Sequence, residues 1–246
     1  MVTASTLRRF GSIEPTGRGV VLPAYHPAAK AGNTIFPSRV FDPDEVQRVL
    51  KTGHQSRKIG KVVTKGHRKG WPIFTLTLEE RATCPRNCTE WLHCYGSNMQ
   101  AAERIVAGPA LESALLSELA ALQRKHPCGF MVRAHVLGDF YSTRYVETWR
   151  EALVSFDGLH LFGFTARQRD SEIGDSVARL IAEFGWARVA VRFSGADGRT
   201  QASRVLEPGA IDGAAIVCPA QTGAADCCAS CALCWQSDRS IAFRRH

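Results

Sequence analysis

Residues 159–193 read LHLFGFTARQRDSEIGDSVARLIAEFGWARVAVRF, and this stretch predicts the fold more directly than any other. Both of its ends are rich in leucine, valine and phenylalanine, as buried strands are. Between them, apolar side chains recur along one face of a helix, at Ile173, Val177, Leu180, Ile181 and Phe184. Asp170 or Ser171 can begin this helix, and Gly185 can end it. The stretch therefore predicts a strand–helix–strand unit with parallel strands.

Segments on both sides of this unit repeat the alternation. Strands are predicted at 72–78, 130–137, 214–218 and, as a short segment, 240–243. Helices are predicted at 42–50, from about Ser97, at 109–124, and from Ser142 or Thr143. The expected fold class is therefore α/β, with parallel βα repeats that form a partial (β/α) barrel or an open sheet. In both arrangements the loops after the strands share one rim, where such folds place their sites.

The chain divides into three expected regions. Residues 1–70 are rich in proline and glycine and predict an irregular, basic N-terminal extension. Residues 71–212 are expected to form the βα core, and residues 213–246 its last strand and a cysteine-rich, metal-binding segment. The stretch from Arg48 to Lys69 is basic and has no acidic residue, so it is either a nucleic-acid contact or a solvated arm.

The composition limits the class of protein. The chain has 246 residues, of which 45% are hydrophobic, so it is long enough to bury a large core. It has no run of about 18 apolar residues, and we expect neither a membrane span nor a secretory signal. Its net charge of +8 favours an anionic partner, such as nucleic acid or a nucleotide. The number of cysteines is odd, nine, and eight of them are bunched in two groups, which favours metal ligation in the cytoplasm over disulfides.

The first cysteine group, Cys84, Cys88 and Cys94, follows a predicted strand directly. A structural zinc ion needs four protein ligands, so zinc here would require His93 or a distant residue as well. A four-iron cluster bound by three cysteines would instead leave one iron open to a small molecule, which is a catalytic arrangement. Both interpretations remain open at this point.

The second group contains Cys218, Cys227, Cys228, Cys231 and Cys234. Their spacing suits either an iron–sulfur cluster or a zinc site with four thiolates, and either Cys227 or Cys228 could be the ligand. The ninth cysteine, Cys128, stands alone before a strand and is expected to be a small core residue.

A cysteine triad directly after a strand, followed by βα repeats, resembles the radical S-adenosylmethionine (SAM) enzymes over roughly residues 72–195. In that family three cysteines hold a 4Fe-4S cluster whose free iron binds SAM. The resemblance implies that Gly138 and Asp139, which follow the second core strand, hold the SAM amino group. It also implies that Thr165, Arg192 and Ser194, at the ends of later strands, contribute to the cofactor site.

Several motifs look more specifically like radical-SAM-like proteins of phages and mobile elements. They are Cys94-Tyr95-Gly96, Gly138-Asp139-Phe140, Phe164-Thr165-Ala166-Arg167 and Val191-Arg192-Phe193-Ser194. The ending, with Cys218-Pro219-Ala220-Gln221 before the cysteine run, resembles the phage family called gene product eighty-eight. The triad has the spacing CX3CX5C, whereas the radical SAM family has CX3CX2C.

Two functions follow as hypotheses. The first is an iron–sulfur enzyme, in which reduced cluster and SAM generate a 5′-deoxyadenosyl radical that attacks an unknown substrate. This enzyme would need a reductant, and the basic stretch suggests a nucleic-acid or nucleotide substrate. The alternative is a non-enzymatic nucleic-acid-binding protein of phage or mobile-element origin, in which both cysteine groups bind structural zinc.

Overall fold

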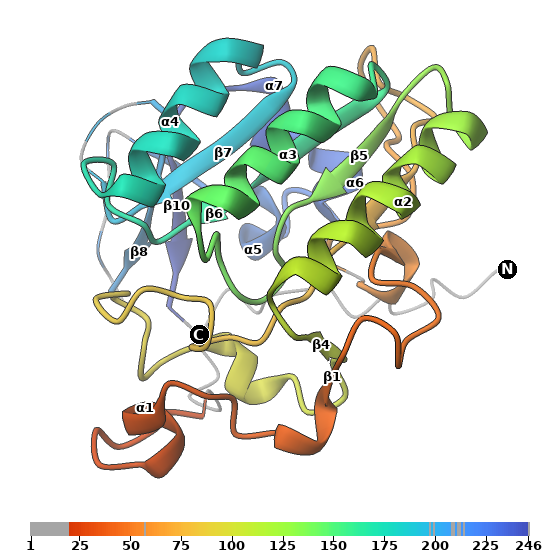
Figure 1. The fold of residues 1–246 in the computed structure, drawn as a ribbon. Coiled ribbons are helices and arrows are strands. Elements are labelled where there is room, and N and C mark those ends of the chain that lie inside the picture. The colour runs from red at the N-terminus through yellow and green to blue at the C-terminus, as the bar shows by residue number, and fades with distance from the viewer. Residues whose placement is uncertain are drawn as a thin grey trace, which may run out of the picture.

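The computed structural model describes residues 20–56, 58–196, 198, 200–207, 210, 213 and 215–245. The first 19 residues of the expected N-terminal extension, Arg57 of its basic stretch and the first residue of the 214–218 strand lie outside this description. The described part confirms an α/β fold with a mostly parallel sheet and several helices (Figure 1).

The main sheet has eight strands in the order β2-β3-β5-β6-β7-β8-β10-β9. Their bounds are β2 Lys51–Thr52, β3 Ile73–Thr75, β5 Phe130–Arg133, β6 Leu159–Thr165, β7 Val189–Ser194, β8 Ala202–Leu206, β9 Ile216–Val217 and β10 Ile241–Arg244. Only β2 runs antiparallel to its neighbour, and the other neighbouring pairs are parallel. A second, two-stranded sheet pairs β1 (Val40–Phe41) with β4 (Arg104–Ile105) in parallel.

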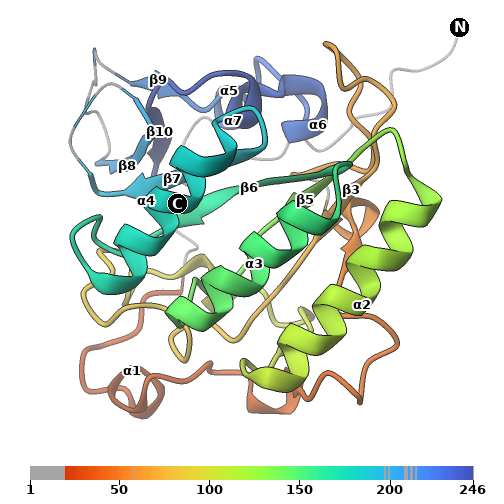
Figure 2. The ribbon, with the colours of Figure 1, turned by 45° about the horizontal axis from the view of Figure 1, so that its top comes forward.

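One face of the main sheet is covered by three helices that lie side by side (Figure 2). They are α2 (Pro109–Lys125), α3 (Thr143–Ser155) and α4 (Glu172–Phe184). Their apolar stripes, such as Leu111, Leu115 and Leu119 of α2, pack on Val132 and Leu161 of the strands and are fully buried. The helical periodicities at 109–124 and 171–185 therefore predicted these elements correctly.

The starts of α3 and α4 are capped as the sequence predicts. The Ser142 hydroxyl accepts the Tyr145 amide at 3.0 Å, and the Ser171 hydroxyl accepts the Gly174 amide at 3.1 Å. Gly185 lies at the end of α4 with φ +72°, a conformation that favours glycine.

We expect Ser142→Ala to lower the free energy of unfolding by about 1 kcal/mol, because the Tyr145 amide loses its acceptor. Ser142→Thr keeps an oxygen at this position and is the matched control, with a loss of only a few tenths of a kcal/mol. Urea unfolding measures both variants. Equal losses would contradict a capping role for this hydroxyl.

The opposite face of the sheet is covered by the cysteine-rich C-terminal segment. It contains three short helices, α5 (Pro219–Thr222), α6 (Cys228–Cys231) and α7 (Leu233–Gln236). Trp235 is buried against Phe162 of β6, with ring centroids 4.8 Å apart. Ile59 and Val63, from the expected N-terminal extension, belong to the same apolar cluster. The sheet is therefore packed on both faces, as parallel sheets are.

The predicted helix at 42–50 is wrong. This segment forms turns, and the amides of Val49 and Leu50 donate to the Glu118 carboxylate of α2 at 2.7 and 2.9 Å. A side chain from another element thus replaces the helical carbonyl partners.

The helix predicted from about Ser97 is also wrong, apart from a short 3₁₀ turn at Tyr95–Asn98. Arg104 donates to the carbonyls of Gly96, Met99 and Ala102, so these groups have no need of helical partners. Among the described helices, none is long and apolar enough to cross a membrane.

Candidate functional site

The first cysteine group lies on the loop that follows β3, at the carboxyl edge of the sheet. This loop runs beside the chain that follows β5, because Leu76 donates to the Arg133 carbonyl and Leu78 to the Leu137 carbonyl. Loops after neighbouring parallel strands meet at one edge. The cysteine loop and the Gly138-Asp139 turn are therefore brought together, as the sequence predicts.

The backbone conformation and the close packing at position 138 both require a glycine. Gly138 has φ +85°, and a Cβ atom there would lie 2.6 Å from both Leu78 Cβ and Thr83 Oγ1. The Thr83 hydroxyl also accepts the Asp139 amide at 3.2 Å. Glycine thus allows this turn to touch the residue before Cys84.

Asp139 is buried and holds the ends of two strands together. Its Oδ1 accepts the Phe140 amide and its Oδ2 the Ala166 amide, both at 2.7 Å, and the Thr165 hydroxyl donates to the same carboxylate. Burial raises the pKa of Asp139 to about 6, although these hydrogen bonds oppose the shift. A carboxylate has about four acceptor positions, so the three protein donors leave about one free.

The thiols of Cys84, Cys88 and Cys94 are partly buried and lie close enough to affect one another. Burial raises the pKa of all three, that of Cys88 to about 11, and the charges of neighbouring thiols and of Asp139 raise the pKa values of Cys84 and Cys88 further. Arg81 and Arg104 act in the opposite direction on Cys94. The free thiols are therefore protonated at neutral pH, and metal binding would release protons.

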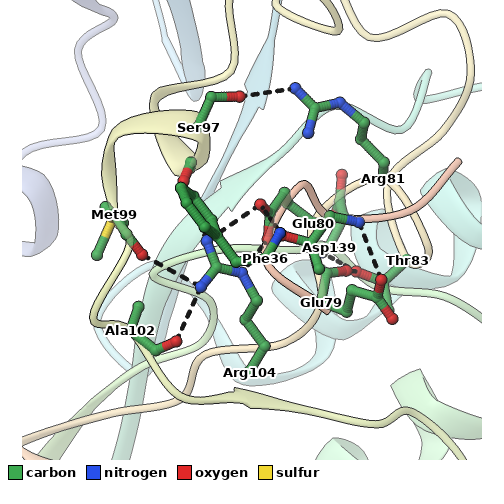
Figure 3. Close-up of polar contacts among 12 residues, drawn as sticks. Phe36, Glu79, Glu80, Arg81, Thr83, Ser97, Met99, Ala102, Arg104 and Asp139 are labelled. Carbon is green, nitrogen blue, oxygen red and sulfur yellow. Dashed lines mark hydrogen bonds and ion pairs between the residues drawn. The ribbon is translucent and has the colours of Figure 1, made fainter. Parts of the chain in front are cut away.

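A buried ion pair fixes the loop around Cys94 (Figure 3). Arg104 Nε lies 2.7 Å from Glu80 Oε2, and both side chains are almost completely inaccessible to solvent. Arg104 also holds the carbonyls of Met99 and Ala102, and the Phe36 ring lies over its guanidinium at 5.1 Å. The ion pair thus joins the loop after β3 to the chain beyond Cys94.

Arg81 fixes the same loop from its other side (Figure 3). It donates to the Trp91 carbonyl at 3.2 Å and to the Ser97 hydroxyl at 2.9 Å. Its backbone has φ +65°, which is uncommon for a residue other than glycine. Such strain is retained where surrounding contacts determine it, and it often marks functional sites.

Residues 20–36 of the N-terminal extension pack on the cysteine loop (Figure 1). The short helix α1 (Pro27–Ala31) presents its carbonyls to Arg86, which donates to Lys30 and Ala31 at 2.8 Å each. The Trp91 indole also donates to the Ala29 carbonyl, at 3.2 Å. Residues 20–36 therefore support the cysteine loop, a role that the sequence analysis missed.

The remaining predicted cofactor residues are placed differently. Thr165 contacts Asp139 at the same edge. Arg192 is fully buried, lies over the Trp186 ring at 4.8 Å and donates to the carbonyls of Ser237 and Asp238. The Ser194 hydroxyl lies 3.2 Å from that of Ser203. Arg192 is thus bound to the C-terminal segment, whereas Gly138, Asp139 and Thr165 gather beside the first cysteine group.

The second cysteine group surrounds a pocket. Its lining consists of Cys218, Pro219, Ala220, Cys228, Cys231, Leu233, Cys234 and Ile241. Cys227 lies outside this lining, and its sulfur is 3.6 Å from the Ser230 hydroxyl. Cys128 is exposed in the turn between α2 and β5, so its predicted core position is wrong.

Within the described residues, no three His, Cys, Asp or Glu side chains are arranged to hold one metal ion. Comparison with family models, with curated proteins and with solved structures finds no match for this chain. Its chemistry must therefore be argued from its own residues.

Proposed function

We propose that this chain is an iron–sulfur enzyme similar to the radical SAM enzymes. The observation that carries the proposal is the grouping of the Cys84, Cys88 and Cys94 thiols beside Gly138 and Asp139 at the carboxyl edge of a parallel sheet. We also propose that the sheet curves around this edge as a partial (β/α) barrel.

The donor set fits a four-iron cluster. Each thiolate binds a separate iron in such a cluster, so three thiolates leave one iron free and need not meet at one atom. Arg81 and Arg104 lie near Cys94 and offset the negative charge that bound thiolates bring. When bound, the cluster would supply the electron that cleaves SAM.

The residues around the cluster would bind and orient SAM rather than react with it. Asp139 has about one acceptor position left, which suits a single ammonium hydrogen bond. Gly138 lets the backbone approach a ligand closely. Thr165 positions Asp139, because its hydroxyl donates to that carboxylate. Arg167 positions the chain before Cys84, because it donates to the Thr83 carbonyl at 2.6 Å.

The substrate class is proposed to be a nucleic acid or nucleotide, on grounds of charge. The chain carries a net charge of +8, and Lys61, Lys65 and Lys69 are exposed. Other basic residues of the same stretch serve the fold, because Lys51 pairs with Glu103 at 2.8 Å and Arg68 is buried. A nucleic-acid contact would therefore involve only part of the 48–69 stretch.

The test is anaerobic purification with cluster reconstitution, followed by iron and sulfide analysis. We expect the variant with Cys84, Cys88 and Cys94 all replaced by alanine to hold about four irons fewer per chain than the unchanged protein. With dithionite as the reductant, only the unchanged protein should convert SAM to 5′-deoxyadenosine. Cys128→Ser is the matched control, because this exposed cysteine should affect neither measurement.

Equal iron in the unchanged protein and the triple variant would contradict the proposal. Zinc in place of iron, after reconstitution, would favour the alternative of a zinc-stabilised nucleic-acid-binding protein. Binding to a labelled oligonucleotide at several salt concentrations would then be the next measurement.

A further inference from the structure

The pocket in the C-terminal segment is enclosed by four cysteines from three elements. Cys218 follows β9 and begins α5, Cys228 and Cys231 are the first and last residues of α6, and Cys234 lies in α7. The pocket is partly open to solvent. Four sulfur ligands around one space are a complete set for a thiolate-bound metal centre.

The backbone separates Cys228 from Cys227. Cys228 begins α6, and Cys231 follows it three residues later, so both lie on one side of a helical turn. Cys227 precedes the helix with an extended backbone, φ −158°. Its sulfur points toward Gly60, where a Cβ atom would lie 2.9 Å from it. The glycine leaves room there for the Cys227 side chain.

We propose that Cys218, Cys228, Cys231 and Cys234 hold a second four-iron cluster, and that Cys227 is not a ligand. The proposal does not depend on SAM chemistry at the first cysteine group.

Geometry and spacing favour a cluster over zinc. In a zinc site with bonds of about 2.3 Å, the ligands surround one ion. Among the described residues, no three His, Cys, Asp or Glu side chains are arranged around one such ion, although these four cysteines line one pocket. Three cysteines at two-residue intervals, with a distant fourth that precedes proline, are also typical of four-iron sites. Cys228, Cys231 and Cys234 have this spacing, and Cys218 precedes Pro219.

The charges around the pocket suit a centre with four thiolates. Lys58, Arg133 and Arg192 lie near Cys234. Arg192 is fully buried, and it donates hydrogen bonds to the Ser237 and Asp238 carbonyls of the same segment. These cations would stabilise the negative charge of a cluster bound through four sulfurs.

A cluster with four protein ligands has no open iron. It would therefore stabilise the fold of the C-terminal segment or carry electrons, rather than bind substrate. Its ligands would connect the end of β9 to α6 and α7, which cover the face of the sheet opposite α2, α3 and α4. Ala232 and Trp235, next to these cysteines, are already buried there.

The test uses the variant that lacks Cys84, Cys88 and Cys94, so that iron at the second site is measured alone. After anaerobic reconstitution we expect about four irons and four sulfides per chain, and an electron paramagnetic resonance signal on reduction with dithionite. Adding Cys228→Ser should remove the signal and most of the iron. Adding Cys227→Ser, the matched control next to it in sequence, should leave both unchanged.

A second measurement does not depend on whether a variant folds. In the reconstituted, unmutated chain, iodoacetamide should label Cys227 while the four ligands stay protected, and cluster removal with an oxidant and chelator should expose them. Loss of iron in Cys227→Ser but not in Cys228→Ser, or zinc in place of iron, would overturn the proposal. Because iron at the first site is measured by a different set of variants, failure of one cluster is distinguishable from failure of the other.

Discussion

The Glu80→Gln variant is expected to have a free energy of unfolding about 3–5 kcal/mol below that of the unchanged chain. Glu80 and Arg104 are both fully buried, and the substitution leaves the guanidinium without a counter-charge in a place that water does not reach. The Thr34 hydroxyl donates to Glu80 Oε1 at 2.7 Å, and its hydrogen bond would lose the charge of its acceptor. Urea unfolding followed by tryptophan fluorescence measures the loss.

The same substitution should weaken cluster binding at the first cysteine group. Arg104 holds the carbonyls of Gly96, Met99 and Ala102, so its displacement frees the chain that follows Cys94. Iron retained after reconstitution and gel filtration should therefore fall in Glu80→Gln, even under conditions where the variant is folded.

Two comparisons isolate the effect of the buried charge. Asp175→Asn removes the partner of Arg179 in an exposed ion pair on α4, and we expect a change of no more than about 0.5 kcal/mol. The double variant Glu80→Gln with Arg104→Met should be more stable than Glu80→Gln alone, because no unpaired charge remains. A double variant that is less stable than the single one would show that the hydrogen bonds of Arg104 to the Gly96, Met99 and Ala102 carbonyls, and not the unpaired guanidinium, dominate.

The core elements were predictable because their signals are local. The strand–helix–strand unit at 159–193 contains its own periodicity, its cap at Ser171 and its stop at Gly185, and the structure reproduces all three. By contrast, β8 was missed, since its five residues include Ser203 and Arg204. The placement of β10 between β8 and β9 depends on contacts between distant segments, which periodicity does not encode.

The candidate site, like the fold, was predictable from the sequence only in part. The grouping of the cysteines and their position after strands followed from spacing alone. The support of the first cysteine group did not, because Glu80 reaches Arg104 across 24 positions and Arg86 reaches Ala31 across 55. The sequence placed Glu79, Glu80 and Arg81 at the end of a strand, where charged residues could have been recognised as candidates for the rim. The separation of Cys227 from Cys228 depends on Gly60, which no local pattern connects to either.

The stability of this protein is expected to fall in acid because of a buried histidine. His135 follows β5, is 3% exposed and packs edge-on against Phe140, with ring centroids 4.7 Å apart. Burial, with a smaller contribution from Arg133, lowers its pKa to about 3 from an ordinary value near 6.5. The folded chain therefore keeps His135 neutral at pH values where the unfolded chain binds a proton.

The direction of the pH effect follows from this difference in proton binding. Above pH 6.5 neither state binds a proton at His135, so this residue contributes no pH dependence to the free energy of unfolding. As pH falls from 6.5 toward 3, the unfolded state is favoured by about 1.4 kcal/mol per pH unit. Between pH 7.5 and pH 5, His135 alone should lower the free energy of unfolding by about 2 kcal/mol.

The His135→Phe variant tests this expectation, since it fills the same space with a ring that does not titrate. Between pH 7.5 and pH 5, it should lose about 2 kcal/mol less than the unchanged chain in urea unfolding. Tyr145→Phe is the matched control, because it removes the hydroxyl that lies 3.2 Å from His135 Nε2 and leaves the buried imidazole in place. This control should lose stability at both pH values and keep the steep dependence on pH. If His135→Phe kept the same steep dependence, the acid sensitivity would arise from other groups, such as His160, whose pKa burial lowers to about 4.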